Sequence, residues 1–77
     1  MKEFIEFIAK HLVDSPDNVL VEITEPDDHT VELQLTVGAD DVGKVIGKQG
    51  KTAQSMRTLL TAVAAKEGKR ASLKIID

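Results

Sequence analysis

Apolar and polar residues alternate along this chain with two different periods, and these periods predict where its helices and strands lie. The first segment has apolar residues at helical spacing, which predicts a helix from residue 1 or 2 to Val13. Ser15-Pro16 ends this helix, because the residue before a proline avoids the helical region. The apolar stripe of the helix consists of Phe4, Ile5, Ile8 and Leu12.

A two-residue period follows and predicts two strands, over residues 19–24 and 30–37. Pro26-Asp27-Asp28 lies between them and is typical of a hairpin turn. Apart from Leu20, polar residues occupy the alternate positions of both strands. We therefore expect a sheet with one face open to water and the other face covered by helices.

Helical spacing returns at Val42, and Asp40 is the predicted N-cap of a short helix there. A glycine-bracketed turn, residues 47–50, ends this helix. A long helix from about Thr52 to Lys66 comes next, with an apolar period made by Ala53, Met56, Leu59, Leu60 and Val63.

Gly68 fits the position just past the end of the long helix, and residues 70–76 are predicted to form a last strand. The predicted order of elements is α-β-β-α-α-β. The fold class is therefore α+β, with a three-stranded sheet covered on one face by helices.

Composition limits the possible functions before any motif is considered. A chain of 77 residues has room for one core, so we interpret residues 1–77 as a single domain. Hydrophobic residues at 42% and charged residues at 30% are typical of a folded protein. The cysteine count of 0 is compatible with a reducing compartment. Neither a secretory signal nor an apolar run of ~20 residues is present, which predicts a cytoplasmic protein.

Charge is distributed unevenly along the sequence. The net charge is −3, but up to Asp41 the only basic residues are Lys2 and Lys10, among many acidic ones. From Val42 onward the balance is reversed, and the basic residues are Lys44, Lys48, Lys51, Arg57, Lys66, Lys69, Arg70 and Lys74. Local charge at a binding site determines how many phosphates are neutralised, so this basic half suits a nucleic-acid partner. Segregation of charge for solubility is the alternative.

The most informative stretch is Gly47-Lys48-Gln49-Gly50, which joins the two predicted helices and which we call the GXXG loop. Glycine accepts positive φ and allows another molecule's backbone to come close. The helix that follows directs its unsatisfied N–H groups and positive dipole toward this loop. Lys44, Lys48 and Lys51 add positive charge around it. The loop is thus a candidate site for a phosphodiester backbone.

With helices on both sides and strands before and after it, Val45-Ile46-Gly47-Lys48-Gln49-Gly50 resembles the KH domain, a nucleic-acid-binding module. That resemblance implies that the GXXG loop clamps the backbone of about four nucleotides. The element order is similar to the type II, or prokaryotic, KH arrangement. One departure is Ala53, where the KH pattern usually has a large aliphatic residue, and it bears on base selectivity more than on backbone binding.

A closer resemblance is to the small bacterial KH proteins of the KhpA (YlqC) type, which share the segment His11-Leu12-Val13-Asp14-Ser15-Pro16 near the start. It implies a homodimer, or pairing with a larger KH-containing protein of the Jag (KhpB) type. It also implies a role as a post-transcriptional regulator or RNA chaperone, in cell-envelope, cell-shape and cell-division physiology. The small residues of the predicted long helix, Ala53, Ala62, Ala64 and Ala65, offer a candidate surface for association.

Other motifs are weaker. Gly50-Lys51-Thr52 matches the end of a phosphate-binding P-loop, but that motif needs a glycine at the position of Val45 and a preceding strand. His11 and His29 have no carboxylate partners at metal-binding spacing. No serine or threonine has a recognisable base nearby. We therefore predict no enzyme activity, no catalytic residue, no metal and no cofactor.

The predicted mechanism is clamping of single-stranded RNA. Phosphates would approach the N–H groups of residues 47–50, with charge from Lys48 and Lys51 and a hydrogen bond from Gln49. Bases would lie across an apolar strip that includes Val45 and Ile46. Arg57 is a candidate for a phosphate or base contact, and a solvated surface arginine is the alternative. The competing function is a KH-shaped protein-interaction or ribosome-assembly adaptor with little RNA affinity.

Overall fold

The structure is a computed structural model that describes residues 1–76. Within these residues the α-β-β-α-α-β order and the α+β class predicted from the sequence are both confirmed. Short 3₁₀ turns lie between some of the elements. The helices and strands are α1 (Lys2–Leu12), β1 (Leu20–Asp27), β2 (Thr30–Thr36), α2 (Val42–Ile46), α3 (Lys51–Lys66) and β3 (Arg70–Ile76).

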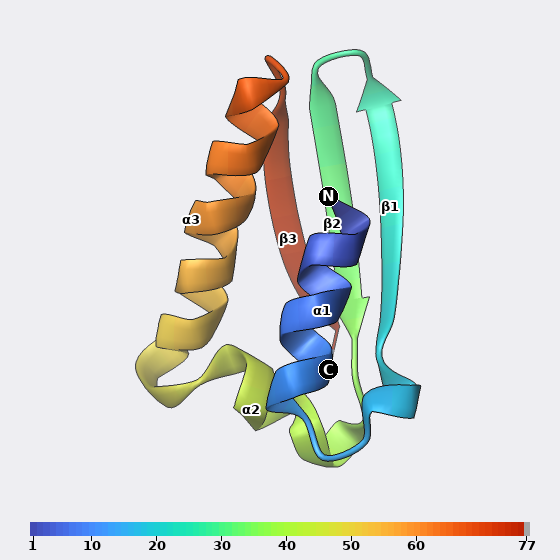
Figure 1. Ribbon diagram of the computed structural model, residues 1–77, viewed down its shortest axis with the longest axis vertical. Coiled ribbons are helices and arrows are strands. Elements are labelled where there is room, and N and C mark those ends of the chain that lie inside the picture. The colour runs from blue at the N-terminus through green and yellow to red at the C-terminus, as the bar shows by residue number, and fades with distance from the viewer. Residues whose placement is uncertain (77) are drawn as a thin grey trace.

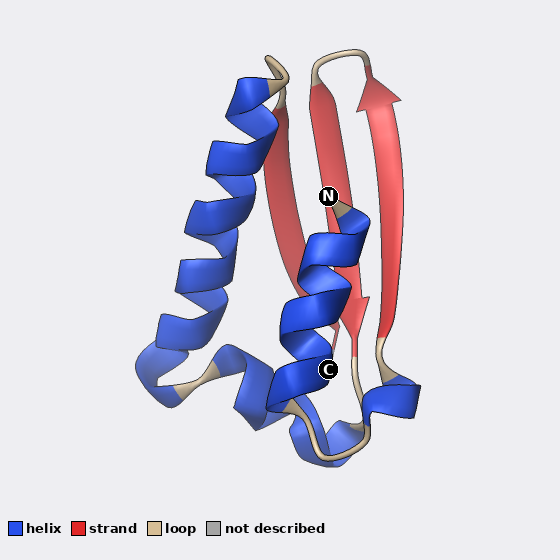
Figure 2. Ribbon diagram, viewed as in Figure 1, coloured by secondary structure: helices blue, strands red, loops and turns tan. Residues whose placement is uncertain are grey.

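The three strands form one sheet in the order β1-β2-β3. β1 and β2 are an antiparallel hairpin, whereas β2 and β3 are parallel. A parallel pair requires a crossover connection, and α2 and α3 supply it. Helices α1 and α3 lie side by side on one face of the sheet, and α2 with the loop that follows it lies at one end (Figure 1). The view coloured by secondary structure shows the same two layers (Figure 2).

The hydrophobic core lies between the sheet and the two long helices. Alternate residues of β2, namely Val31, Leu33 and Leu35, are at most 1% exposed, as the two-residue period predicted. From α1, Ile5 and Ala9 are fully buried against them. The buried face of α3 consists of Ala53, Met56, Leu60 and Ala64.

Two leucines predicted to lie on apolar stripes are instead on the surface. Leu12 is 37% exposed and Leu59 is 50% exposed. Leu59 lies about 100° from the centre of the buried stripe of α3, so it faces the flank of the helix. Leu12 is the last residue of α1, where the chain turns away toward β1, and Ala9 occupies the buried position on that face. Whether a helical side chain is buried therefore depends more on whether it faces the sheet than on how hydrophobic it is.

The predicted hairpin turn was placed too early in the sequence. β1 continues through Pro26 to Asp27, and Asp27 pairs with Thr30 after an irregularity in register. Proline is tolerated there because the ladder is already interrupted. The Asp27 carboxylate accepts the His29 N–H at 2.7 Å, and this bond, followed by one from the Thr30 hydroxyl at 3.3 Å, lowers the pKa of Asp27.

Gly68 ends α3 as predicted. Its φ is 71°, and the N–H groups of Gly68 and Lys69 donate to the carbonyls of Ala65 and Ala64, both at 3.0 Å. Among the described residues, no helix is both long enough and apolar enough to span a bilayer.

Candidate nucleic-acid interface

The GXXG loop has a backbone conformation that ordinary residues rarely adopt. Gly47 has φ 78° and ψ 173°, and Gly50 has φ 75° and ψ 10°. Gln49 also has positive φ, 57°, although it carries a side chain. Gly47 ends α2 and Gly50 precedes α3, so the two glycines reverse the chain between the helices.

Gly47 is required for a second reason, which is close packing. A Cβ atom at Gly47 would lie 2.1 Å from the Thr52 side-chain oxygen and 2.9 Å from the Thr52 backbone nitrogen. Gly50, by contrast, has nothing within 4 Å of such an atom. The first glycine therefore lets the start of α3 fold directly back onto the end of α2, whereas the second satisfies only the backbone angle.

The structure narrows the set of loop N–H groups that can meet a ligand. The Gly47 N–H donates to the Gly43 carbonyl at 2.9 Å, and the Gly50 N–H donates to the Gly47 carbonyl at 3.1 Å. Within residues 1–76, the backbone N–H groups of Lys48 and Gln49 donate no hydrogen bond to a residue outside their own 3₁₀ turn. The two middle residues, rather than all four as predicted, are thus the available backbone donors.

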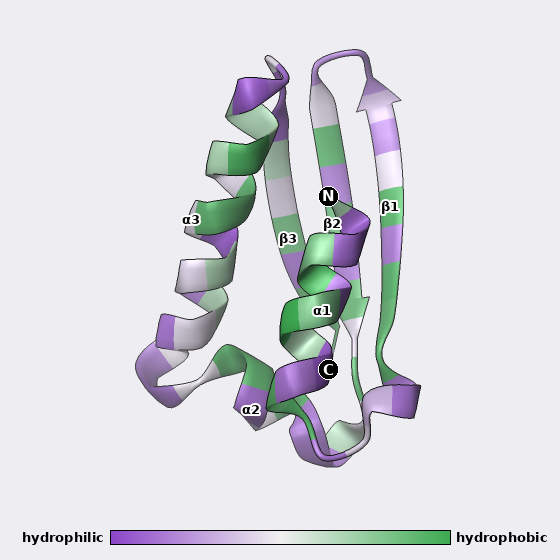
Figure 3. Ribbon diagram, in the orientation of Figure 1, coloured by the Kyte–Doolittle hydropathy of each residue, from purple (hydrophilic) through white to green (hydrophobic). Residues whose placement is uncertain are grey.

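The side chains around the loop are exposed and basic. Lys48, Gln49 and Lys51 all lie at the surface, and neither lysine pairs with a carboxylate in the described part of the chain. Hydrophilic colouring marks this turn between α2 and α3 (Figure 3). Free backbone donors and uncompensated ammonium groups therefore occur together at one corner of the molecule.

Lys44, also predicted to serve the site, is placed differently. Its ammonium lies 2.8 Å from the Asp14 carboxylate and 3.2 Å from the Asp41 carboxylate. The hydrogen bonds to Asp14 and then Asp41 outweigh partial burial and raise the pKa of Lys44. Two carboxylates therefore compensate the charge of Lys44.

Asp41 is a residue that the sequence analysis did not single out. It is 2% exposed, and it is the one buried polar or charged side chain within residues 1–76. Burial opposes ionisation of its carboxyl, but bonds from the backbone N–H groups of Asp14 and Ser15, together with Lys44, outweigh this effect and lower its pKa. The prediction that Asp40 is the N-cap of α2 is wrong, because Asp41 occupies that position. Because Asp40 and Asp41 are adjacent aspartates, the sequence does not indicate which of the two carboxylates is buried.

The apolar strip predicted beside the loop is smaller than expected. Val45 is fully buried, so its side chain belongs to the core and is not part of an exposed strip. Ile46 is partly exposed and lies at the end of α2. Ala53, the departure from the KH pattern, is 3% exposed and adds little surface.

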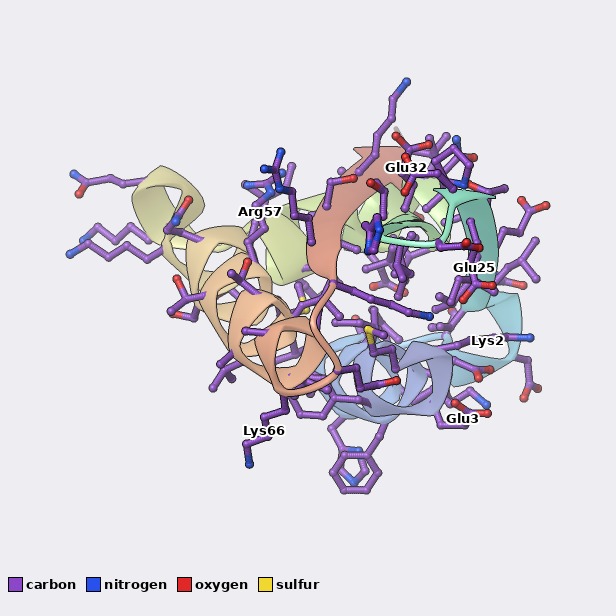
Figure 4. All side chains as sticks on the ribbon, turned by 90° about the horizontal axis from the view of Figure 1, so that it is seen from above. Lys2, Glu3, Glu25, Glu32, Arg57 and Lys66 are labelled. Atoms are coloured by element: carbon purple, nitrogen blue, oxygen red, sulfur yellow. The ribbon has the colours of Figure 1, made fainter. Side chains whose placement is uncertain are left out.

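Arg57 lies two turns along α3 and beside β3 (Figure 4). Its Nε donates to the Leu73 carbonyl at 3.2 Å, which ties the guanidinium group to the outer edge of the sheet. In the same view Glu3 and Glu25 lie toward α1 and β1, on the other side of the molecule (Figure 4). Arg57 thus lies on the side of the molecule away from these two glutamates.

Comparison with known proteins decides the family. The family model described as "KhpA/KhpB, KH domain" matches residues 2–75. The chain belongs to the KhpA/KhpB KH-domain family. It is 50% identical to "RNA-binding protein KhpA" of Halalkalibacterium halodurans, with 100% of both chains covered. It is 49% identical to the protein of the same name from Clostridium acetobutylicum, covering 99% of this chain and 100% of that one. The corresponding Borreliella burgdorferi protein is 48% identical, with 97% and 90% covered. No solved structure matches the chain.

Membership in the KhpA/KhpB family agrees with the observed fold, including the GXXG loop between the second and third helices. The KH resemblance found in the sequence is therefore confirmed.

Proposed function

We propose that this KhpA/KhpB-family chain binds single-stranded RNA by holding its sugar-phosphate backbone on the GXXG loop. The observation that carries the proposal is the pair of unpaired N–H groups of Lys48 and Gln49, framed by two glycines at positive φ. Relatives with about half of their residues identical are named as RNA-binding proteins, and the KH module binds nucleic acid through this loop.

Each loop residue has a distinct role in the proposed complex. One phosphate accepts the Lys48 and Gln49 N–H groups, while the Lys48 and Lys51 ammonium groups neutralise it and its neighbour. The Gln49 side chain bonds a phosphate or sugar oxygen. Gly47 and Gly50 contribute shape only, because their N–H groups already have partners.

The bases of the bound strand lie between the end of α2 and the edge of β3. Ile46 supplies the apolar contact, since Val45 is buried. Arg57, fixed by its bond to Leu73, directs its remaining N–H groups to a phosphate or base edge. Phe4 and Phe7 are both on α1, away from this edge, so stacking on aromatic rings has no part in the mechanism.

A site with so few contacts gives weak and salt-sensitive binding. We infer a binding protein and not an enzyme, acting in the cytoplasm as a post-transcriptional regulator or RNA chaperone. The cytoplasmic location rests on the sequence features given above.

The salt dependence of binding tests this function. We expect a fluorescent single-stranded RNA of about 12 nucleotides to bind with an affinity that falls as salt rises, with a logarithmic slope of about −0.7 for each phosphate neutralised. Three or four phosphate contacts therefore predict a slope between about −2 and −3. Fluorescence anisotropy at several salt concentrations measures it, and a duplex of the same sequence is the matched ligand. Equal binding of the duplex, or no binding of either RNA, would contradict the proposal.

We also propose that the chain acts as a dimer, with a second copy or with a larger KH-containing partner of the Jag (KhpB) type. Two linked sites raise the effective concentration of each without new contacts, which compensates for one weak site. Of the alanines expected to form the association surface, Ala53 and Ala64 are buried inside the domain, and Ala62 and Ala65 are exposed. Leu59, Ala62 and Ala65 follow one another at three-residue spacing, so these exposed residues lie in a row along α3.

Leu59→Glu is expected to weaken homodimerisation at least about 100-fold. A two-fold interface uses the same residue twice, and each buried leucine contributes about 1.5–3 kcal/mol. Sedimentation equilibrium of the parent and the variant measures the change. Leu12→Glu, the same substitution at an exposed leucine on α1, serves as the control. A parent that is monomeric, or a dimer unaffected by Leu59→Glu, would rule out this surface.

A further inference from the structure

The buried Asp41 carboxylate connects two parts of the chain that are far apart in sequence. It accepts the backbone N–H of Asp14 at 3.2 Å and that of Ser15 at 3.1 Å, both in the connection between α1 and β1. It also accepts the Lys44 ammonium at 3.2 Å. A buried carboxylate is stable only when its oxygens are satisfied, and none of the buried side-chain polar atoms described lacks a partner.

This network is attached to the helix that carries the GXXG loop. Asp41 immediately precedes α2, and α2 has only five residues before it reaches Gly47. So short a helix is not stable by itself, and its orientation depends on tertiary contacts. Val45 anchors it from the core side, and the Asp41 carboxylate anchors its first turn to the α1–β1 connection. A change at Asp41 would therefore tilt α2 about Val45 and displace the loop at its other end.

We propose that Asp41 is a positioning residue for the GXXG loop, and that Lys44 acts through Asp41 and not as a phosphate ligand. The expected effect on RNA binding rests on the proposed RNA-binding function. The positioning of the loop by Asp41 does not depend on that function. One ammonium group against the carboxylates of Asp14 and Asp41 leaves this cluster without a net positive charge. A phosphate is therefore not attracted to Lys44 as it is to Lys48 and Lys51.

Asp41→Asn is the central variant, because the asparagine amide has nearly the same shape as the carboxylate. It lacks the negative charge that binds the Asp14 and Ser15 N–H groups and the Lys44 ammonium. Its matched control is Asp40→Asn, an exposed carboxylate at the preceding position. We expect Asp41→Asn to bind single-stranded RNA about tenfold more weakly, since a loop that holds the binding geometry one tenth of the time reduces apparent affinity by that factor. Amide hydrogen exchange at Gly50 and Lys51, whose N–H groups are hydrogen-bonded within the loop, is measured by NMR without RNA. It is expected to accelerate at least about fivefold in Asp41→Asn and to stay unchanged in Asp40→Asn.

The two lysines separate positioning from direct contact. Lys48→Met is expected to reduce the salt slope of binding by about 0.7, the value for one phosphate on a single strand. Lys44→Met is expected to leave the slope unchanged and to weaken binding about threefold. In the Asp41→Asn background, Lys44→Met is expected to have no additional effect, because both residues act through one network. A slope reduced by Lys44→Met, or additive effects in the double variant, would overturn the assignment.

Circular dichroism confirms that each variant is folded at the temperature used. If Asp41→Asn does not fold, Lys44→Met alone still decides between positioning and direct contact through the slope. Exchange at Gly50 and Lys51 that is equal in the parent and Asp41→Asn would refute the positioning role, whether or not RNA binds. If the parent binds no RNA but Asp41→Asn accelerates the exchange, the positioning role stands and the RNA-binding proposal fails.

Discussion

Gly47→Ala is expected to destabilise the domain and to weaken RNA binding more than any other single change in the GXXG loop. The added methyl group would meet Thr52 at 2.1 Å from its side-chain oxygen and 2.9 Å from its backbone nitrogen. A backbone atom cannot rotate away, so α2 and α3 must separate. The φ of 78° with ψ of 173° adds strain, because this region is used almost only by glycine.

The expected loss of unfolding free energy is about 2–5 kcal/mol, from backbone strain and overpacking together. For a domain of this length, that corresponds to a fall in melting temperature of roughly 10–30 °C. Thermal unfolding followed by circular dichroism measures the fall. RNA affinity, measured below the melting temperature, is expected to decrease by more than about tenfold because separation of α2 and α3 displaces the N–H groups of Lys48 and Gln49.

Two other glycines are matched controls for this change. Gly43 lies inside α2, and a methyl group added there would have no neighbour within 4 Å, so Gly43→Ala is expected to stabilise the domain by about 0.5–1 kcal/mol. Gly50→Ala meets no neighbour but is strained by its φ of 75°, which costs about 1–2 kcal/mol. Equal stability of Gly47→Ala and Gly50→Ala would show that contact with Thr52 is unimportant.

The order of the elements could be predicted because each has a clear local signal. The two-residue period of β2 identifies Val31, Leu33 and Leu35 as core residues, and all three are buried. Gly68 marks the end of α3 through a requirement for positive φ, which few other residues meet. Local chemistry determines these features, so the sequence alone suffices for them.

Features that depend on contacts between distant segments could not be predicted. Leu59 and Leu60 are adjacent and identical in type, yet only Leu60 faces the sheet, because the docking angle of α3 decides which side is buried. Asp40 and Asp41 are likewise adjacent and identical in type. Only Asp41 is buried, because its carboxylate accepts the backbone N–H groups of Asp14 and Ser15. These donors are 27 and 26 residues away along the chain.

The candidate site shows the same division. The two glycines and exposed Lys48 and Lys51 follow from the motif and its flanking helices. The role of Lys44 does not, because its carboxylate partners come from another part of the fold. Proximity in sequence to a binding loop is thus a weaker guide for a charged residue than the charges that surround it in space.

Replacing both middle residues of the loop, Lys48→Asp with Gln49→Asp, is expected to reduce RNA affinity at least about thirtyfold at about 0.1 M salt while leaving the fold intact. The change removes one positive charge and places two carboxylates beside the bound phosphate. Each of the two carboxylates opposes binding by about a factor of five in a water-like dielectric at a separation of ~4 Å from the phosphate. Aspartate tolerates the positive φ of Gln49 better than most residues do, so the backbone of the loop is expected to persist.

A matched control carries the same change in charge farther along α3 and outside the proposed association surface, Thr61→Glu with Lys66→Glu. Both positions are exposed, and they lie about 15 Å and 22 Å along the helix from Lys51 at about 1.5 Å per residue. Those distances exceed the Debye length of ~10 Å at about 0.1 M salt, so the control is expected to change affinity less than about twofold. Anisotropy titrations of the parent and both variants, with circular dichroism to confirm folding, make the comparison. If the two variants bind equally well, the total charge of the domain governs RNA binding and the GXXG loop does not.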